Sequence, residues 1–250
     1  MTFSTALIIL GASAVTAFIS GIFGMAGGLI LMGILIALPS VSVAQAMIIH
    51  GALQMVANGW RAVLLREHID WTVMRRYSAG AALGTAALFA IAWTPDKQAV
   101  YLLLGLAPLL IWLPKRRLHL DIQRRAHAFG AGVAVQAMNT LAGVAGPLLD
   151  IFFVRGEMTR QQIVATKSMT QTLSHVVKIG FWSLPVFSAA GWGALPPAGF
   201  FAAAIPIAMA GTWAGGRVLA IMSDVNFKAW MKYLVTAIGA VMLARAAGLY

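Results

Sequence analysis

Six stretches of this chain are long and apolar enough to cross a lipid bilayer as helices. A spanning helix needs about 20 mostly apolar residues, because the hydrocarbon core is about 30 Å thick and each residue adds about 1.5 Å. The predicted spans are residues 43–65, 70–93, 98–114, 161–186, 198–217 and 229–247. Only 10% of the 250 residues are charged, whereas a soluble domain carries about a quarter. We therefore predict an all-α polytopic membrane protein.

Two further apolar stretches, 4–38 and 126–154, are too long for one spanning helix and too short for two. A glycine cluster interrupts each of them, GMAGG at 24–28 and GVAGP at 143–147. Glycine and proline interrupt the helical hydrogen-bond ladder, and membrane proteins tolerate the freed backbone groups only where protein or water surrounds them. We predict a broken, re-entrant helix in each stretch. Glycine-rich helix packing is the alternative for either cluster taken alone.

The two halves of the chain carry these features in the same order, which indicates an internal duplication. A shift of 119 residues superposes Gly24 on Gly143 and Gly27 on Gly146. A shift of 117 residues then aligns four polar pairs in the next helix: His50 with Lys167, Gln54 with Gln171, Asn58 with His175, and Arg61 with Lys178. Further on, Gly84-Thr85 matches Gly211-Thr212 at a larger offset.

The duplication predicts two inverted repeats, each a re-entrant helix followed by three transmembrane helices. An odd number of crossings per copy reverses the orientation of the second copy, an arrangement common in secondary transporters. The predicted boundaries are 1–114 for the first repeat, 115–125 for a basic linker and 126–250 for the second repeat. Residues 1–16 have the apolar character of a secretory signal, but the first basic residue is Arg61, so we assign them to the first repeat.

Lysine and arginine residues concentrate on one side of this predicted bundle. Two, Lys97 and Arg245, lie on the opposite side. Thirteen lie on the favoured side: Arg66, Arg75, Arg76, Lys115, Arg116, Arg117, Arg124, Arg125, Arg155, Arg160, Arg217, Lys228 and Lys232. Basic loops are typical of the cytoplasmic face, so we predict a cytoplasmic linker and two external termini. The same bias accounts for the net charge of +11 without a nucleic-acid partner.

Polar residues at helical spacing form a stripe on each of two predicted spans. His50, Gln54, Asn58 and Arg61 lie within about 80° of arc on one helix face. The second stripe comprises Lys167, Gln171, His175 and Lys178, with Thr170 and Ser174 beside it. Ionisable residues within a membrane are costly and usually functional. The structural alternatives are snorkelling of Arg61 and Lys178 to an interface, and hydrogen bonds that join helices.

These residues predict a site for a small anion near the bilayer midplane. Helix N-termini and cationic donors both stabilise negative charge, and no ring of carboxylates is available for a cation. The predicted substrate-binding residues are Gly24, Gly27, Gly28, His50, Gln54, Asn58, Arg61, Gly143, Gly146, Lys167, Thr170, Gln171, Ser174, His175 and Lys178. The chain has no cysteine, and we predict no metal or cofactor.

Three groups inside the predicted apolar segments are candidates for proton coupling, namely Asp150, His50 and His175. An unperturbed imidazole has a pKa near 6.5. Asp150 is the one carboxylate in an apolar segment. It either pairs with Lys167 or Arg61, or it takes up protons.

Several short motifs resemble the sulfite exporter family written TauE/SafE, over about residues 10–245. In the first half these are GIFGMAGG at 21–28, NGWR at 58–61 and IDW at 69–71. In the second half they are GVAGP at 143–147, ATK at 165–167 and HVVK at 175–178. The resemblance implies a multi-pass permease of the cell inner membrane that carries sulfite, sulfonates or related sulfur anions. Ala26 and Ala145 stand where glycine is common in the family, and Asp150 where an apolar residue or proline is usual, which bears on the identity of the anion.

Two other classes of function compete with a proton-linked carrier. An anion channel needs the same site but no alternating gates. An intramembrane enzyme of the lipid-pyrophosphate phosphatase type needs paired carboxylates or a metal set, and no predicted span holds two carboxylates. We therefore predict a transporter and not an enzyme. Its expected partners are a small anion and the lipid bilayer. The sequence does not decide whether the protein forms a homo-oligomer.

The basic asymmetry predicts that both termini are external and that residues 115–125 are cytoplasmic. Single cysteines introduced at either terminus should react with a membrane-impermeant maleimide added to intact cells, because the chain has no native cysteine. Cysteines within 115–125 should react only after lysis. A C-terminus protected in intact cells would contradict the inverted arrangement.

Overall fold

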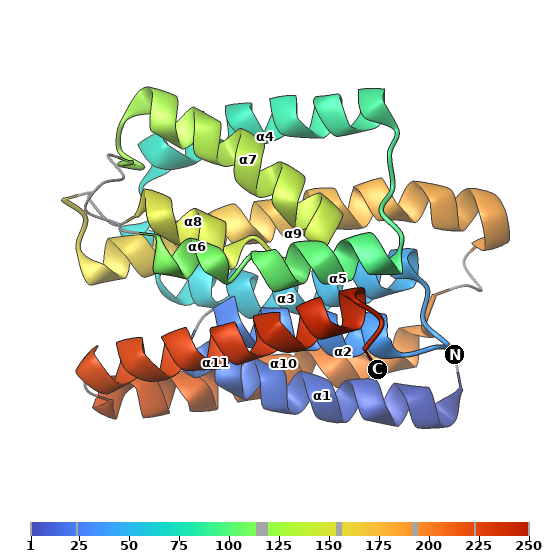
Figure 1. The fold of residues 1–250 in the computed structure, drawn as a ribbon. Coiled ribbons are helices and arrows are strands. Elements are labelled where there is room, and N and C mark those ends of the chain that lie inside the picture. Colours follow the sequence, from blue (N-terminus) through green and yellow to red (C-terminus); the bar gives the residue numbers. More distant parts are fainter. Residues whose placement is uncertain are drawn as a thin grey trace.

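The computed structural model describes residues 2–23, 25–113, 120–153, 157–191, 195–222 and 224–249. Within these ranges the regular structure is helical throughout (Figure 1), so the all-α prediction is confirmed for them. Five residues named above, Gly24, Lys115, Arg116, Arg117 and Arg155, lie outside the described ranges.

The first glycine-interrupted stretch is a helical hairpin. Its arms are α1 (Phe3–Phe23) and α2 (Met25–Ala37), which pack against each other. The hydroxyls of Thr5 and Ser40 are hydrogen-bonded at 3.2 Å, so the hairpin returns to the end of the bundle where it begins. A side chain at Gly27 would collide with the Thr16 carbonyl on α1, and this is why the arms require a glycine there.

The second interrupted stretch is also a hairpin, formed by α7 (Arg125–Ala142) and α8 (Gly146–Phe152). The Ile122 N–H donates to the Phe152 carbonyl at 2.8 Å, so entry and exit lie side by side. Gly143 ends α7 with φ of +81°, a left-handed conformation that favours glycine. Pro147 follows in the first turn of α8, where its missing N–H costs no helical hydrogen bond. Both breaks fall where the glycine clusters predict them.

The two helices that follow the hairpins begin with the same capping motif. Ser42 caps α3 (Val43–Leu64) and Thr159 caps α9 (Arg160–Ala190). In each, the cap hydroxyl accepts the N–H of a glutamine three residues on, and that glutamine side chain accepts the cap N–H. The two capping boxes are 117 residues apart, the same shift that aligns the polar stripes.

The remaining helices are α4 (Trp71–Ile91), α5 (Lys97–Leu106), α6 (Leu109–Trp112), α10 (Ala198–Ile221), α11 (Asp224–Ala246) and the short 3₁₀ helix η1 (Arg66–His68). The predicted span 98–114 is therefore not one continuous helix. It turns at Ala107 and Pro108, because Pro108 has no N–H to continue the ladder.

In the described part of the chain, α1 and α10 pass a test of length and hydropathy for membrane spans. The helices α3 and α9 are long enough but carry the polar stripes. Large apolar side chains such as Val63, Leu83 and Leu184 are more than half exposed on the outside, while polar side chains are buried within. This pattern fits a helical membrane protein, whose exterior contacts lipid.

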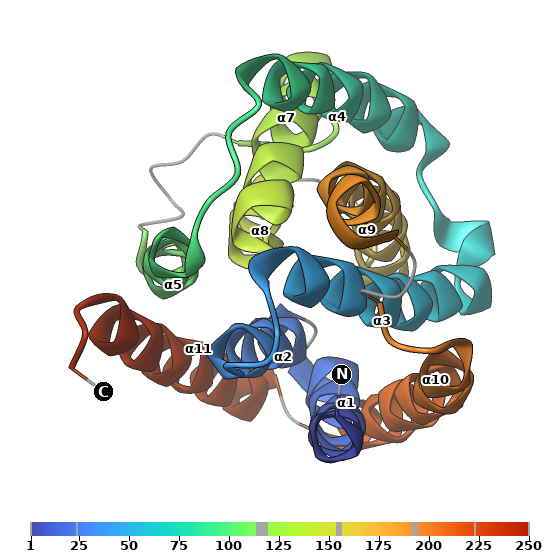
Figure 2. The same cartoon turned by 90° about the vertical axis from the view of Figure 1, so that its right-hand side faces the viewer.

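The closest helix pairs join the two halves of the sequence (Figure 2). The helix α1 packs along α10, α4 along α7, and α3 along α9. A Cβ at Gly84 on α4 would lie 2.9 Å from the Val133 carbonyl on α7, and one at Gly211 on α10 would lie 3.1 Å from the Ala14 carbonyl on α1. The 119-residue shift relates Ala14 to Val133. The contact of Gly84 in the first half with Val133 in the second is therefore equivalent to the contact of Gly211 in the second half with Ala14 in the first.

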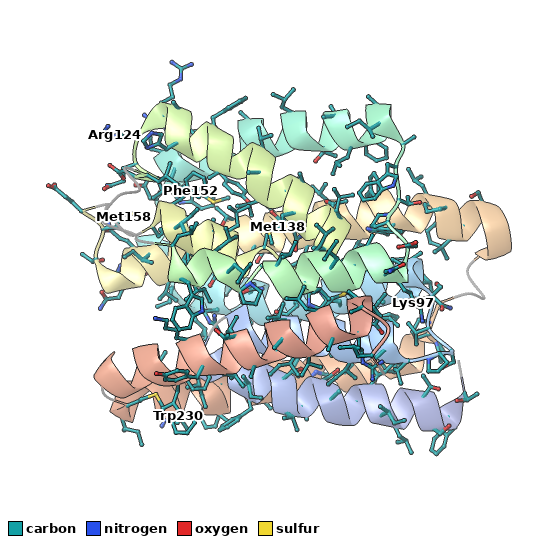
Figure 3. All side chains as sticks on the ribbon, viewed as in Figure 1. Lys97, Arg124, Met138, Phe152, Met158 and Trp230 are labelled. Carbon is teal, nitrogen blue, oxygen red and sulfur yellow. The ribbon has the colours of Figure 1, made fainter. Side chains whose placement is uncertain are left out.

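Basic residues lie at both ends of the bundle. Arg124 lies at one end and Lys97 at the other (Figure 3). The Lys97 end also holds both ends of the described chain (Figure 1), and the Gln98 amide there donates to the Ala246 carbonyl at 3.2 Å. The Arg124 end holds Arg76, whose guanidinium donates to the Gln123 carbonyl at 2.8 Å.

Candidate functional site

A small cavity lies between the two hairpins and the α3–α9 pair. Its volume is about 20 Å³, room for roughly one water molecule. Five elements line it through Gly28, His50, Gln54, Val135, Asn139, Val144, Ala145, Gly146, Gln171, Ser174 and His175. We call it the central cavity.

A chain of hydrogen bonds joins the two hairpins behind the wall of this cavity. The Lys178 ammonium on α9 donates to the Gly143 carbonyl at 2.9 Å and to Nδ1 of His50 at 2.8 Å. Because an ammonium has only donors, Nδ1 accepts and the second ring nitrogen carries the proton. That nitrogen, Nε2, donates to the Gly28 carbonyl at 2.9 Å. One lysine and one neutral histidine thus connect both helix breaks.

The Lys178 side chain is fully buried, with 0% of its surface exposed. Among the described residues, its two hydrogen-bond partners are an imidazole and a carbonyl, both neutral. A buried cation without a counter-ion is costly in a low-dielectric interior. A negative charge in the adjacent cavity would compensate it.

Two polar atoms at the cavity have no hydrogen-bond partner in the part of the chain that the structure describes. They are Nδ2 of Asn139 and Nδ1 of His175, both buried. The His175 ring faces His50 with 5.6 Å between ring centroids. Beside them the Ser174 hydroxyl is hydrogen-bonded to the Tyr77 hydroxyl at 2.8 Å. The cavity therefore presents an amide donor and a ring nitrogen without partners among the described residues, although buried polar groups are usually satisfied.

A larger cavity of about 290 Å³, the outer cavity, lies toward the Arg124 end. Arg61, Lys167 and Asp150 line it, and Lys167 forms an ion pair with the Asp150 carboxylate. The two side chains are 26% and 18% exposed, so the pair is partly accessible. Gln171 lines both cavities and so separates them.

The two repeat-matched cations satisfy carbonyls at the ends of the first hairpin arms. The Arg61 guanidinium donates to the Ser20 carbonyl at 3.0 Å, in the last turn of α1. Lys178 donates to the carbonyl of Gly143, which ends α7. The last four carbonyls of a helix lack helical donors and carry partial negative charge. Each cation therefore has a structural task in addition to any contact with a ligand.

The predicted site residues divide between the two cavities. Seven line the central cavity: Gly28, His50, Gln54, Gly146, Gln171, Ser174 and His175. Arg61, Lys167, Asp150 and again Gln171 line the outer cavity. Five line neither: Gly27, Asn58, Gly143, Thr170 and Lys178. Asn58 and Thr170 instead donate to carbonyls of their own helices, at Gln54 and Lys167.

The sequence interpretation missed Val135, Asn139, Val144 and Ala145 as cavity-lining residues. Asn139 is the important omission, since it is the one polar side chain among them. Gln136, Asn139 and Thr140 form a polar face at helical spacing within the apolar stretch 126–154, and all three are buried. That spacing is the signal from which Asn139 could have been found. Within the described ranges, no group of three or more metal-ligating side chains occurs.

A family model described as "Sulfite exporter TauE/SafE" matches residues 9–242, a range that includes both polar stripes, both cavities and both hairpins except the first residues of α1. No curated protein and no solved structure matches the chain.

The His50–Lys178 contact predicts a large coupling energy in a double-mutant cycle. His50→Phe should leave Lys178 with one partner fewer and destabilise the protein, while Lys178→Met should remove that penalty from the double variant. We expect a coupling of about 1 to 3 kcal/mol from denaturant unfolding of the detergent-purified protein. Additive effects would show that the two side chains do not depend on each other.

Proposed function

Because the chain belongs to the TauE/SafE sulfite exporter family, we propose that it is a secondary transporter of small sulfur-containing anions such as sulfite or organosulfonates. The observation that carries this proposal is the buried Lys178, which has only neutral partners among the described residues and lies one hydrogen bond behind the central cavity. Family membership is consistent with a transport protein that is not an enzyme.

An anion bound in the central cavity would complete three incomplete interactions. Its charge would compensate Lys178 through His50, and its oxygens would accept from Asn139 Nδ2 and from a protonated Nδ1 of His175. Gln54 and Ser174 add an amide and a hydroxyl to the wall. The donors point to an oxyanion, because each anion oxygen can accept more than one of them.

The volume of the central cavity supports alternating access. About 20 Å³ admits a water molecule but not an oxyanion with three oxygens. Binding therefore requires the walls to move apart, and both hairpins contribute to those walls. The outer cavity provides an approach from the Arg124 end, with Gln171 as the partition between approach and site.

Two inverted repeats are the arrangement that best fits the packing. The hairpins open at opposite ends of the bundle, since Thr5 meets Ser40 at the Lys97 end and Ile122 meets Phe152 at the Arg124 end. The capping boxes, the matched cations and the exchanged glycine contacts support the same relation. We place the basic Arg124 end in the cytoplasm and both termini outside, by the positive-inside rule.

Proton linkage would reduce the charge that crosses the membrane. An anion that approaches Lys167 competes with Asp150 for the ammonium, and we propose Asp150 as the group that carries the proton. His50 and His175 are the other candidates, since their rings face each other at the central cavity. Each elementary charge meets about 2.3 kcal/mol per 100 mV.

His175→Leu should weaken sulfite binding by roughly 10- to 150-fold, which corresponds to the 1.5 to 3 kcal/mol of one charge-assisted hydrogen bond. Binding to the purified protein would be measured beside sulfate, thiosulfate and small organosulfonates. Val176→Leu is the matched control, because Val176 is the next residue on α9 and is half exposed on the outside. Unchanged sulfite affinity in a folded His175→Leu protein would show that this residue is not part of the site.

Counterflow of anion in proteoliposomes would distinguish a carrier, which shows it, from a channel, which does not.

A pH gradient at zero membrane potential should drive anion flux into proteoliposomes. Asp150→Asn should abolish the dependence on the gradient while downhill flux continues, because the amide cannot exchange a proton. The parent protein without a gradient serves as the control. Flux in the parent that ignores the gradient would contradict proton linkage and leave Asp150 as a structural partner of Lys167.

A further inference from the structure

A groove on the outer surface combines three arginines with an apolar floor, and we propose that it binds an anionic phospholipid. The groove lies between α4 and α7, at the edge of the bundle (Figure 1), and has a volume of about 790 Å³. Thr72, Arg75, Arg76, Ala79, Arg125, Ala126 and Phe129 line it. We call it the arginine groove. It shares no lining residue with either cavity described above, so this inference goes beyond the proposed transport.

Helical spacing places the lining residues on one face of each helix. On α4 they follow at intervals of three, one and three from Thr72 to Ala79, and on α7 they fall within the first five residues from Arg125 to Phe129. Both helices begin at the Arg124 end of the bundle (Figure 1). At about 1.5 Å per residue, Ala79 lies about 6 Å deeper along α4 than Arg75. The groove is thus charged at its mouth and apolar further in.

None of the described residues that line the groove is acidic, so the charge of its three arginines is uncompensated among them. Two carboxylates in the segments that lead into these helices, Asp70 and Asp121, have other partners. Asp70 caps α4 by accepting the N–H groups of Thr72 and Val73, and Asp121 forms an ion pair with Arg124 at 3.8 Å. Arg76 uses one donor on the Gln123 carbonyl, which orients its guanidinium and leaves further donors available. Guanidinium groups bind phosphate oxygens in pairs, with defined geometry.

The position of the groove matches the depth of a lipid headgroup. Trp71 opens α4 and is 55% exposed, as expected of tryptophan at a membrane interface. One turn beyond Ala79, Leu83 is exposed on the apolar exterior. A phosphate at the arginines would therefore leave an acyl chain beside Ala79 and Phe129. Anionic headgroups are favoured over zwitterionic ones, whose ammonium would face three guanidiniums, and basic pockets between helices bind such lipids.

The test is a titration of the full-length protein in neutral detergent with tail-labelled fluorescent phosphatidylglycerol and phosphatidylcholine. We expect preferential binding of phosphatidylglycerol. The triple variant Arg75→Gln, Arg76→Gln, Arg125→Gln should lose roughly 100-fold in affinity, since each interfacial arginine contributes about a five-fold factor. The matched control is Arg66→Gln, Arg217→Gln, Lys232→Gln, which removes the same charge without touching the groove or the Asp121–Arg124 ion pair, and it should bind as the parent does.

A second pair of variants changes shape and leaves charge intact. Ala79→Trp should fill the groove and weaken phosphatidylglycerol binding, while Leu83→Trp, one turn further along the helix, should not. Equal losses of phosphatidylglycerol affinity in the groove triple variant and in the control triple variant would overturn the proposal in favour of general surface charge. Displacement of the lipid by an equal concentration of inorganic phosphate would indicate a free-anion site. If Ala79→Trp dissociates an oligomer but still binds phosphatidylglycerol, the groove holds a second copy of the chain and the lipid proposal is wrong.

Discussion

The arrangement of the core depends on a single buried ammonium group. Lys178 holds the break of the second hairpin through Gly143 and orients His50, and His50 in turn holds the first hairpin through Gly28. Three hydrogen bonds thus bring together segments more than 110 residues apart. Among the described residues Lys178 has no carboxylate partner, and its two hydrogen-bond acceptors are neutral. The contact that connects the two hairpins is therefore also the one on which the proposed anion site depends.

The two halves use matched residues for tasks that have diverged. Arg61 and Lys178 both satisfy the carbonyl end of a hairpin arm, but Arg61 stands in the outer cavity, while Lys178 is enclosed and reaches across to the other half. His50 and Lys167 are also matched, yet one lines the central cavity and the other forms an ion pair in the outer one. Residues that match in sequence thus stand in different surroundings in the two halves.

Much of the helical layout could be predicted from the sequence, and the division of the site could not. Apolar runs locate the long helices, and glycine clusters locate the two breaks, because both are local properties of the chain. The span 98–114 was predicted as continuous, and Pro108 shows why it turns. His50 and Arg61 were assigned to one site because they share a helix face, but eleven residues extend over about 16 Å, which is too long for one small cavity. Asn139 is not among the predicted site residues, because the prediction rests on the glycine break at 143–147 and Asn139 precedes it on α7.

The packing of α1 along α10 has a consequence for how the protein is made. Gly21 and Gly215, which touch across this pair, are separated by about 190 residues of chain. At about 5 to 20 residues per second of synthesis, α1 waits roughly 10 to 40 s for its partner to emerge from the ribosome. During that interval the face of α1 that packs on α10, which carries Ala14, Ala17 and Gly21, has no helix to cover it. The insertion machinery, or the lipid itself, must contact this face of α1 until the last quarter of the chain is synthesised.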